Sequence, residues 1–180
     1  MIYFGFTTCW RACPTALNAI AQAVEELGDA GNRVQPIFVS LDPQREEPET
    51  IELYLKGFGD RFVGLRGSED QLQAAASAFG ISVQRIRFSA DPTDYTMVHS
   101  SPVIVLIPHK PDPILVKSDS SAEEIRAVLV SALELRAVST DQGSARQFSN
   151  KNRAVFGVES EQPIVRLTMT PNGRRQEVLL

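Results

Sequence analysis

The 180-residue sequence has only two cysteines, two histidines and one tryptophan, so chemistry based on thiols or imidazoles can use very few positions. No apolar run approaches the ~20 residues that a helix needs to span a bilayer. Lys and Arg total 18 against 22 Asp and Glu, a formal net charge of −4, and no basic stripe carries interleaved aromatic residues. This balance argues against a nucleic-acid partner.

We expect no signal peptide before the first apolar segment, because Tyr3 and Phe4 already belong to that segment. A sheet strand seldom starts at the second residue of a chain. We therefore expect a truncated or processed chain whose leading segment, with any export signal, is absent. A hydrophobic content of 43% over this length predicts one full core with a small appendage.

Both cysteines are concentrated in one short segment, residues 5–14, where an apolar stretch leads into a helix. Residues 2–6 are typical of a buried strand, and Pro14 suits the first position of a helix. Cys9 and Cys13 then lie at a helix N-terminus, where unpaired N–H groups and the helix dipole favour a thiolate. Their spacing differs from the two-residue gap of a thioredoxin or a zinc knuckle. It allows either a disulfide or two ligands to one soft metal ion.

Inert buried thiols or a plain structural disulfide are the alternative interpretation of this pair. A strand-to-helix turn places side chains at the edge of a sheet rather than in its core. That context favours a functional role for Cys9 and Cys13.

The order of apolar segments and turn signals predicts an α/β fold. Expected helices and strands alternate in the first half: helix 14–28, strand 34–41, helix from 48, strand 62–65 and helix 68–79. The second half adds extended segments 81–88 and 95–99, strands 103–107 and 114–116, and a helix from 121. A central mixed sheet flanked by helices, with an antiparallel edge hairpin at 103–116, is the thioredoxin-like arrangement. Pro102 either takes the place of the cis-proline of thioredoxins or simply begins a strand.

We expect residues 1–138 to form this domain and residues 139–180 to form a polar linker and tail. The linker composition, rich in Ser, Asn, Gln and Lys, extends over residues 139–153. Apolar stretches at 163–170 and 176–180 flank Pro171-Asn172-Gly173, a hairpin signal, so the tail is expected to be either a small β-hairpin or mostly disordered.

The two histidines have different settings. His109 lies in a polar, Pro-rich turn and is interpreted as solvated. His99 ends an extended segment just before the strand at residue 103. In a thioredoxin-like sheet that edge faces the cysteine loop, so metal ligation by His99 is the stronger hypothesis.

Four motifs, in this order, resemble the Sco/SenC family over about residues 2–136. They are Tyr3-Phe4-Gly5-Phe6-Thr7-Thr8-Cys9 with Cys13-Pro14, then residues 39–46, residues 62–68, and His99-Ser100 before an apolar strand. The family is named for synthesis of cytochrome c oxidase and has a thioredoxin-like fold. The resemblance implies one copper ion per chain, Cu(I) or Cu(II), bound by Cys9, Cys13 and His99.

The resemblance also implies partners and a location. The expected partner is the copper-accepting subunit of cytochrome c oxidase, with other copper chaperones or thioredoxin-like reductants as further partners. Such proteins work outside the cytoplasm on a membrane tether, on the periplasmic side or in the mitochondrial intermembrane space. Here the tether would belong to the missing front end.

This chain departs from the family at two places beside the expected ligands. Trp10-Arg11 stands where the family commonly has an acidic residue between the cysteines, and Val98 replaces an Asp before the histidine. Arg11 removes negative charge beside a cation site, which is expected to weaken copper binding and to favour a reactive thiolate. Val98 removes a partner that could orient His99.

The residue types fit copper independently of the family. Thiolates select Cu(I), and imidazole serves both copper states, whereas a structural zinc site needs four ligands and the chain has no third cysteine. A metallochaperone is therefore the leading hypothesis. The alternatives are a thiol–disulfide oxidoreductase that uses Cys9 and Cys13, and an inactive α/β domain.

Overall fold

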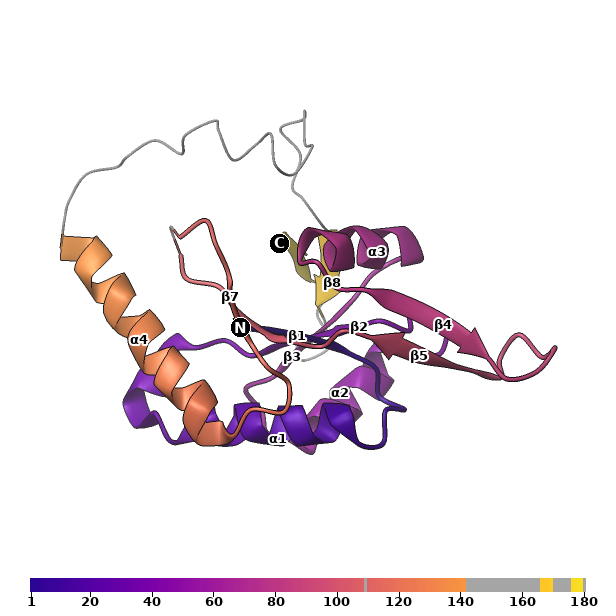
Figure 1. The fold of residues 1–180 in the computed structure, drawn as a ribbon, viewed down its shortest axis with the longest axis horizontal. Coiled ribbons are helices and arrows are strands. Elements are labelled where there is room, and N and C mark those ends of the chain that lie inside the picture. Colours follow the sequence, from indigo (N-terminus) through magenta and orange to yellow (C-terminus); the bar gives the residue numbers. More distant parts are fainter. Residues whose placement is uncertain (109, 142–165, 170–175, 180) are drawn as a thin grey trace, which may run out of the picture.

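A computed structural model describes residues 1–108, 110–141, 166–169 and 176–179 (Figure 1). His109, the linker after residue 141, and the turn around Pro171 lie outside the described residues. Within the described part, no helix combines the length and the apolar character needed to cross a membrane.

A seven-stranded mixed sheet forms the centre of the molecule, in the order β7-β6-β1-β2-β3-β8-β9. Its strands are β1 (Ile2–Gly5), β2 (Ile37–Ser40), β3 (Val63–Arg66), β6 (Val103–Val105), β7 (Ile114–Val116), β8 (Arg166–Met169) and β9 (Gln176–Leu179). The pairs β1–β2 and β2–β3 are parallel, and the other pairings are antiparallel. The predicted mixed sheet and its antiparallel edge hairpin, β6–β7, are therefore confirmed.

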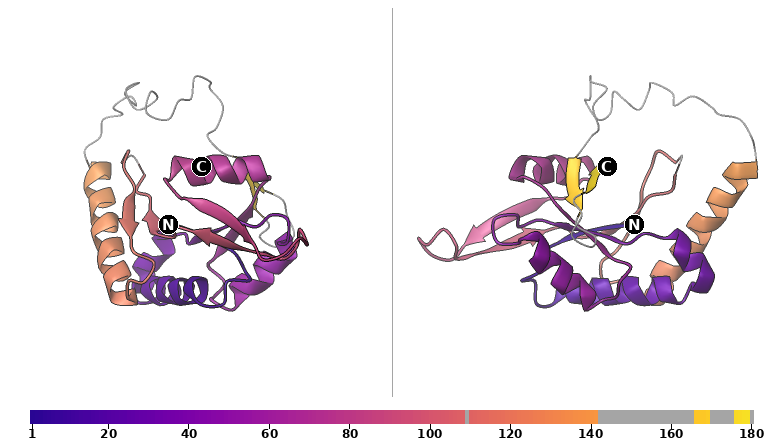
Figure 2. Two further views of the ribbon diagram at one scale, coloured as in Figure 1. Left: turned by 45° about the vertical axis from the view of Figure 1, so that its right-hand side comes forward. Right: turned by 180° about the vertical axis from the view of Figure 1, so that it is seen from behind.

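Helices cover both faces of this sheet (Figures 1 and 2). Helices α1 (Ala12–Glu25), α2 (Pro48–Lys56) and α4 (Ala122–Asp141) share one face, and α3 (Glu69–Ala78) covers the other. A 3₁₀ helix, η1 (Gly28–Arg33), follows α1. Alternate β1 side chains enter the two cores, because successive strand residues point to opposite faces: Tyr3 packs toward α1, whereas Ile2 and Phe4 pack toward α3.

Local sequence signals explain where the helices begin. Ser68 and Gln71 form a reciprocal capping box at the start of α3. Pro48 stands in the first turn of α2, where its missing N–H costs nothing. Helix α1, however, begins at Ala12 rather than at Pro14, so Cys13 is already inside its first turn. Pro14 is tolerated there because first-turn N–H groups have no partner in the helix.

A second, two-stranded sheet carries the histidine. Strands β4 (Val83–Arg87) and β5 (Tyr95–His99) pair antiparallel, with Val83 opposite His99 and Arg87 opposite Tyr95. The predicted extended segments and their polar turn are confirmed. This hairpin projects from the body beside the main sheet rather than extending it (Figure 1).

Two further expectations concern the chain after β5. No described peptide bond is cis, so Pro102 simply precedes β6. In the tail, β8 and β9 pair with each other, and β8 also pairs antiparallel with β3, with Leu65 opposite Met169. These short strands thus continue the sheet beyond β3. The division at residue 138 stays a prediction.

Candidate metal centre

The loop between β1 and α1 places both cysteines at the helix N-terminus. The Cys9 N–H donates to the Phe6 carbonyl at 3.2 Å, which closes a turn after the strand. The Cys13 N–H in turn donates to Cys9 Sγ at 3.4 Å. Arg11, at the N-cap position, makes no side-chain capping bond. The Cys9 sulfur therefore takes the place of the usual capping oxygen, at the positive end of the α1 dipole.

The two thiols differ in burial. Cys13 is completely buried, and this burial raises the pKa of its thiol to about 12. Cys9 is half-buried, and both cysteines are free in this structure. At neutral pH Cys13 is therefore a protonated thiol, whose sulfur becomes a metal ligand only when its proton leaves.

Two tyrosines in the same core cluster as Cys13 have hydroxyls without hydrogen-bond partners in the described part of the structure. Tyr3 Oη and Tyr54 Oη are both buried and make no hydrogen bond in the described part of the structure. Burial raises the pKa values of both tyrosines, and a thiolate at Cys13 would raise them further; the Tyr3 hydroxyl faces Cys13 and Ser101. The Cys13 sulfur thus lies in an environment with unused O–H donors.

His99 lies at the end of β5, as predicted, with one ring nitrogen already engaged. Its Nδ1 is 3.1 Å from the Ser100 carbonyl oxygen, which accepts a hydrogen bond from an Nδ1–H tautomer. That tautomer leaves the Nε2 lone pair available to a metal. Desolvation lowers the pKa of His99 below its usual value, so the neutral, ligand form is favoured.

Phe6 is the common neighbour of the cysteine loop and the histidine. Its ring meets the His99 ring edge-on, with centroids 5.8 Å apart, and it forms a small apolar cluster with Tyr95 and Met97 against which Cys9 packs. Among the described residues, no three His, Cys, Asp or Glu side chains lie close enough to share one metal ion. The structure therefore brings the two cysteines together and leaves His99 on an adjoining element.

Apolar side chains stand at the two positions where the sequence departs from the family pattern. Trp10 is 87% exposed between the cysteines, and Val98 is 49% exposed beside His99. Arg11 is also exposed.

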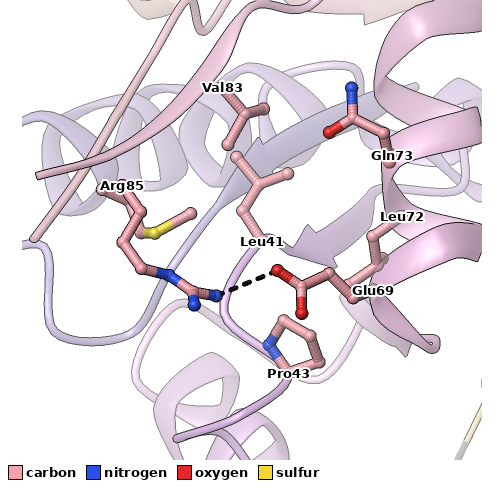
Figure 3. A pocket seen from close by; sticks show the side chains of 8 residues that line it. Leu41, Pro43, Glu69, Leu72, Gln73, Val83 and Arg85 are labelled. Atoms are coloured by element: carbon pink, nitrogen blue, oxygen red, sulfur yellow. Dashed lines mark hydrogen bonds and ion pairs between the residues drawn. The ribbon is translucent and has the colours of Figure 1, made fainter. Parts of the chain in front are cut away.

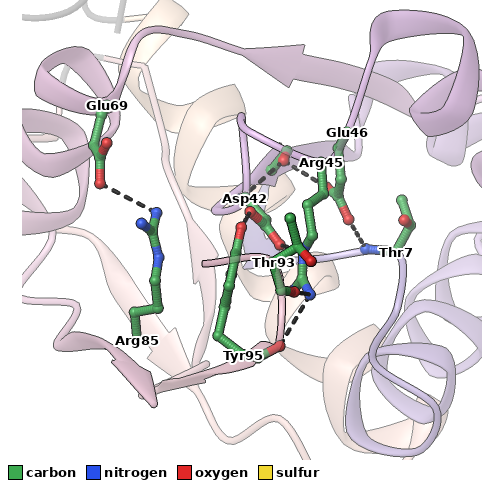
Figure 4. A network of polar contacts seen from close by, with 9 residues as sticks. Thr7, Asp42, Arg45, Glu46, Glu69, Arg85, Thr93 and Tyr95 are labelled. Atoms are coloured by element: carbon green, nitrogen blue, oxygen red, sulfur yellow. Dashed lines mark hydrogen bonds and ion pairs between the residues drawn. The ribbon is translucent and has the colours of Figure 1, made fainter. Parts of the chain in front are cut away.

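A polar network next to the site was not predicted from the sequence (Figure 4). Asp42 and Glu46, in the turn after β2, are almost completely buried. Asp42 accepts from Arg45 Nε at 2.5 Å and from the Tyr95 hydroxyl at 2.5 Å. Glu46 accepts from the Ser40 hydroxyl at 2.5 Å and from the Thr7 backbone N–H. The segment 39–46 was noted only as a family motif, and its acidic composition is equally that of a solvated turn.

Comparisons with known proteins decide the family. The SCO1/SenC family model matches residues 1–134. This chain belongs to the SCO1/SenC family. The SCO2-like protein of Rickettsia felis is 38% identical over 101 residues, covering 56% of this chain and 49% of that protein. The human mitochondrial SCO2 homologue is 34% identical over 114 residues, covering 60% of this chain and 41% of that protein. The chain thus spans half or less of the length of these relatives.

Solved structures of the family share the fold. Copper-bound ScoI from Bradyrhizobium japonicum has a TM-score of 0.63 and 27% identity, covering 73% of this chain and 82% of that one. Apo Sco1 from Thermus thermophilus has a TM-score of 0.55 and 34% identity, covering 76% and 77%. The predicted thioredoxin-like fold is confirmed, with a mixed central sheet and flanking helices.

Proposed function

We propose that this chain is a copper metallochaperone that binds one copper ion through Cys9, Cys13 and His99 and passes it to a partner. The observation that carries the proposal is a pair of free thiols at one helix N-terminus, with a histidine on the adjoining hairpin whose Nε2 is available. Two thiolates and a neutral imidazole suit Cu(I), and three ligands leave a position open for an incoming thiol. The copper-bound B. japonicum ScoI supports copper as the cargo.

The residues present fit this cargo in two respects. The unpartnered Tyr3 hydroxyl can donate to the Cys13 sulfur once it is a thiolate, which would offset part of the cost of a buried negative charge. His99 is held in the tautomer that a metal requires. Binding then needs the end of β5 to approach the cysteines.

The partner we propose is the copper-accepting subunit of cytochrome c oxidase, with other copper chaperones or thioredoxin-like reductants as sources of copper or electrons. The full-length protein is proposed to work outside the cytoplasm, anchored to a membrane. Mitochondrial relatives in human and yeast support a location of this kind. The gene sequence upstream of Met1 is the direct test of an anchor.

Copper titration of the reduced protein against a competing chelator tests the ligand set. We expect one equivalent of Cu(I) per chain, and a large loss of affinity in Cys9→Ala, Cys13→Ala and His99→Ala. A Cys9→Ala or Cys13→Ala variant that binds Cu(I) as tightly as the parent would contradict the proposal. Trp10→Ala, next to Cys9 but without a ligand atom, is the control.

A second candidate function is thiol–disulfide exchange, favoured by the unequal burial of the two thiols. Cys9 is accessible enough to attack a disulfide, whereas Cys13 is buried behind it and would resolve the mixed disulfide. The products would be a Cys9–Cys13 disulfide and a reduced partner dithiol. His99→Ala separates the two functions: lost copper affinity with intact disulfide reduction supports the chaperone. Unchanged affinity with impaired reduction would favour the reductase.

A further inference from the structure

Among the described residues, the hairpin that carries His99 makes no backbone hydrogen bonds to the main sheet, and β4 and β5 pair with each other. Polar contacts attach it to the body at Tyr95, four residues before His99, next to the apolar cluster that Tyr95 and Met97 form with Phe6. The Arg45 guanidinium lies over the Tyr95 ring, 3.8 Å from its centroid, and Arg85 lies 4.6 Å from it. The Tyr95 hydroxyl donates to Asp42, and Arg45 donates to the Tyr95 carbonyl at 2.9 Å.

The same turn also holds the cysteine loop. Glu46 accepts from the Thr7 backbone N–H, two residues before Cys9, and from Ser40 on β2. Asp42 donates its backbone N–H to the Ser40 hydroxyl at 3.2 Å. One turn, residues 42–46, therefore bonds to both segments that carry the proposed ligands (Figure 4).

The other side of the hairpin faces α3. A cavity of about 50 Å³ lies between the hairpin and α3, lined by Leu41, Leu72, Val83 and Met97 among others (Figure 3). The Arg85–Glu69 ion pair, at 3.2 Å, bridges the two elements at this cavity. This ion pair and the polar contacts at Tyr95 act together with the apolar cluster of Phe6, Tyr95 and Met97 to hold the hairpin.

We propose that the turn of residues 42–46 is a positioning element that sets where His99 stands relative to Cys9 and Cys13. This inference rests on the proposed copper function. Taking two carboxylates and a guanidinium out of water is costly, and an apolar contact would hold a hairpin at lower cost. Hydrogen bonds are directional, unlike apolar contacts. Each of these bonds therefore fixes the position of one atom of Tyr95 or Thr7 relative to the same turn. Asp42, Arg45 and Tyr95 act through the placement of His99 and touch no metal themselves.

A double-mutant cycle tests this role, with Cu(I) affinity measured by chelator competition. Tyr95→Phe keeps the ring and removes only the hydroxyl that bonds Asp42. We expect it to lower Cu(I) affinity about tenfold, the smaller end of the effect seen for groups that orient metal ligands. In the His99→Ala background the same change should have no effect, because the ligand that it positions is gone.

A purely structural role predicts a different result, with the same loss of affinity in both backgrounds. That outcome, or an unchanged affinity in Tyr95→Phe alone, would overturn the inference. If His99→Ala itself leaves the parent's affinity unchanged, the proposed ligand set fails and the positioning role fails with it. A loss in His99→Ala without one in Tyr95→Phe removes the positioning role alone.

Arg45→Lys provides a second variant in case Tyr95→Phe folds poorly. This variant keeps the positive charge but loses the planar guanidinium group, which donates to Asp42 and to the Tyr95 carbonyl at the same time. We expect the same dependence on His99. Arg61→Lys is the matched control, since the Arg61 side chain bonds Asn32, outside the network of the 42–46 turn, and the change should leave Cu(I) affinity unaltered.

Discussion

Gly5, the last residue of β1, lies where the sheet meets the buried thiol. A Cβ at this position would stand 2.9 Å from Phe38 Cε2, 3.0 Å from Cys13 Sγ and 3.2 Å from Tyr3 Cε1. These distances are shorter than normal contacts, and two of the three groups are ring atoms fixed in the core. The missing side chain therefore lets the Cys13 sulfur pack directly against the strand.

Replacing this glycine is expected to destabilise the protein and to displace Cys13. Gly5→Ala should lower the free energy of unfolding by about 1–3 kcal/mol, as overpacking of a core does. Urea unfolding of the reduced, metal-free protein measures the effect. Gly57→Ala is the control, because the added Cβ would meet only the Tyr54 carbonyl oxygen at 3.3 Å. Equal losses in the two variants would contradict this account of Gly5.

The raised pKa of Cys13 predicts that copper binding releases a proton. At pH 6–9 the thiol is protonated in the free protein, because its pKa is about 12, and its proton leaves when the sulfur binds Cu(I). Affinity should therefore rise with pH across this range, by up to about tenfold per unit for each proton released.

Chelator competition at several pH values, corrected for the chelator's own protonation, gives the slope of affinity against pH. Cys13→Ala should reduce this slope by about one proton per copper. An affinity of the parent that is independent of pH would show that Cys13 does not lose a proton to the metal.

At the scale of elements, the sequence predicted the ligand carriers because their signals are local. A β-branched and aromatic segment, two cysteines and a proline indicate a strand followed by a helix over residues 2–14. The start of α1 was placed at Pro14, two residues late, because proline is equally acceptable at any position in the first turn. The strand that ends at His99 was recognised from its own composition and the polar turn before it.

Residues 39–46 were noted as a family motif, but the buried polar network of the 42–46 turn was not predicted, and the reason is also physical. Asp42 and Pro43 indicate only that a strand stops there. Burial of Asp42 depends on Tyr95, more than fifty positions later in the sequence, whose hydroxyl and ring satisfy the turn's charged groups. Similarly, the approach of Cys9 to Cys13 is set locally by the loop that leads into α1, whereas the position of His99 relative to either thiol depends on how a separate hairpin packs against the body.

For the whole molecule, the buried Glu46 predicts a dependence of stability on pH. Desolvation raises the pKa of Glu46 above its usual 4.5, against the opposing hydrogen bonds from Ser40 and Thr7. The folded state then holds its proton more tightly than the unfolded state. This contribution is fully present below pH 4.5 and is lost as pH rises through the raised pKa.

Glu46→Gln removes this titration while its amide oxygen can still accept from the Thr7 N–H. Relative to the parent, the variant should therefore gain stability as pH rises from 4 to 8. Urea unfolding of both proteins at several pH values measures the difference in their free energies of unfolding. Contributions from the other titrating groups are common to both proteins and cancel in this difference. A stability difference that stays constant over this range would contradict the raised pKa.

The pairing of β3 with β8 has a consequence for how this chain is made. On one edge β3 pairs with β2, which precedes it in the sequence. On its other edge β3 pairs with β8, which comes only at residues 166–169. During translation this second edge of β3 therefore stays unpaired until β8 has been synthesised, which takes roughly 5–20 s at ordinary rates of elongation. An unpaired edge is a template for other strands. In the nascent chain, the unpaired edge of β3 is thus open to mispairing with other strands after the thiol site has already been synthesised. A folding chaperone would act during this interval.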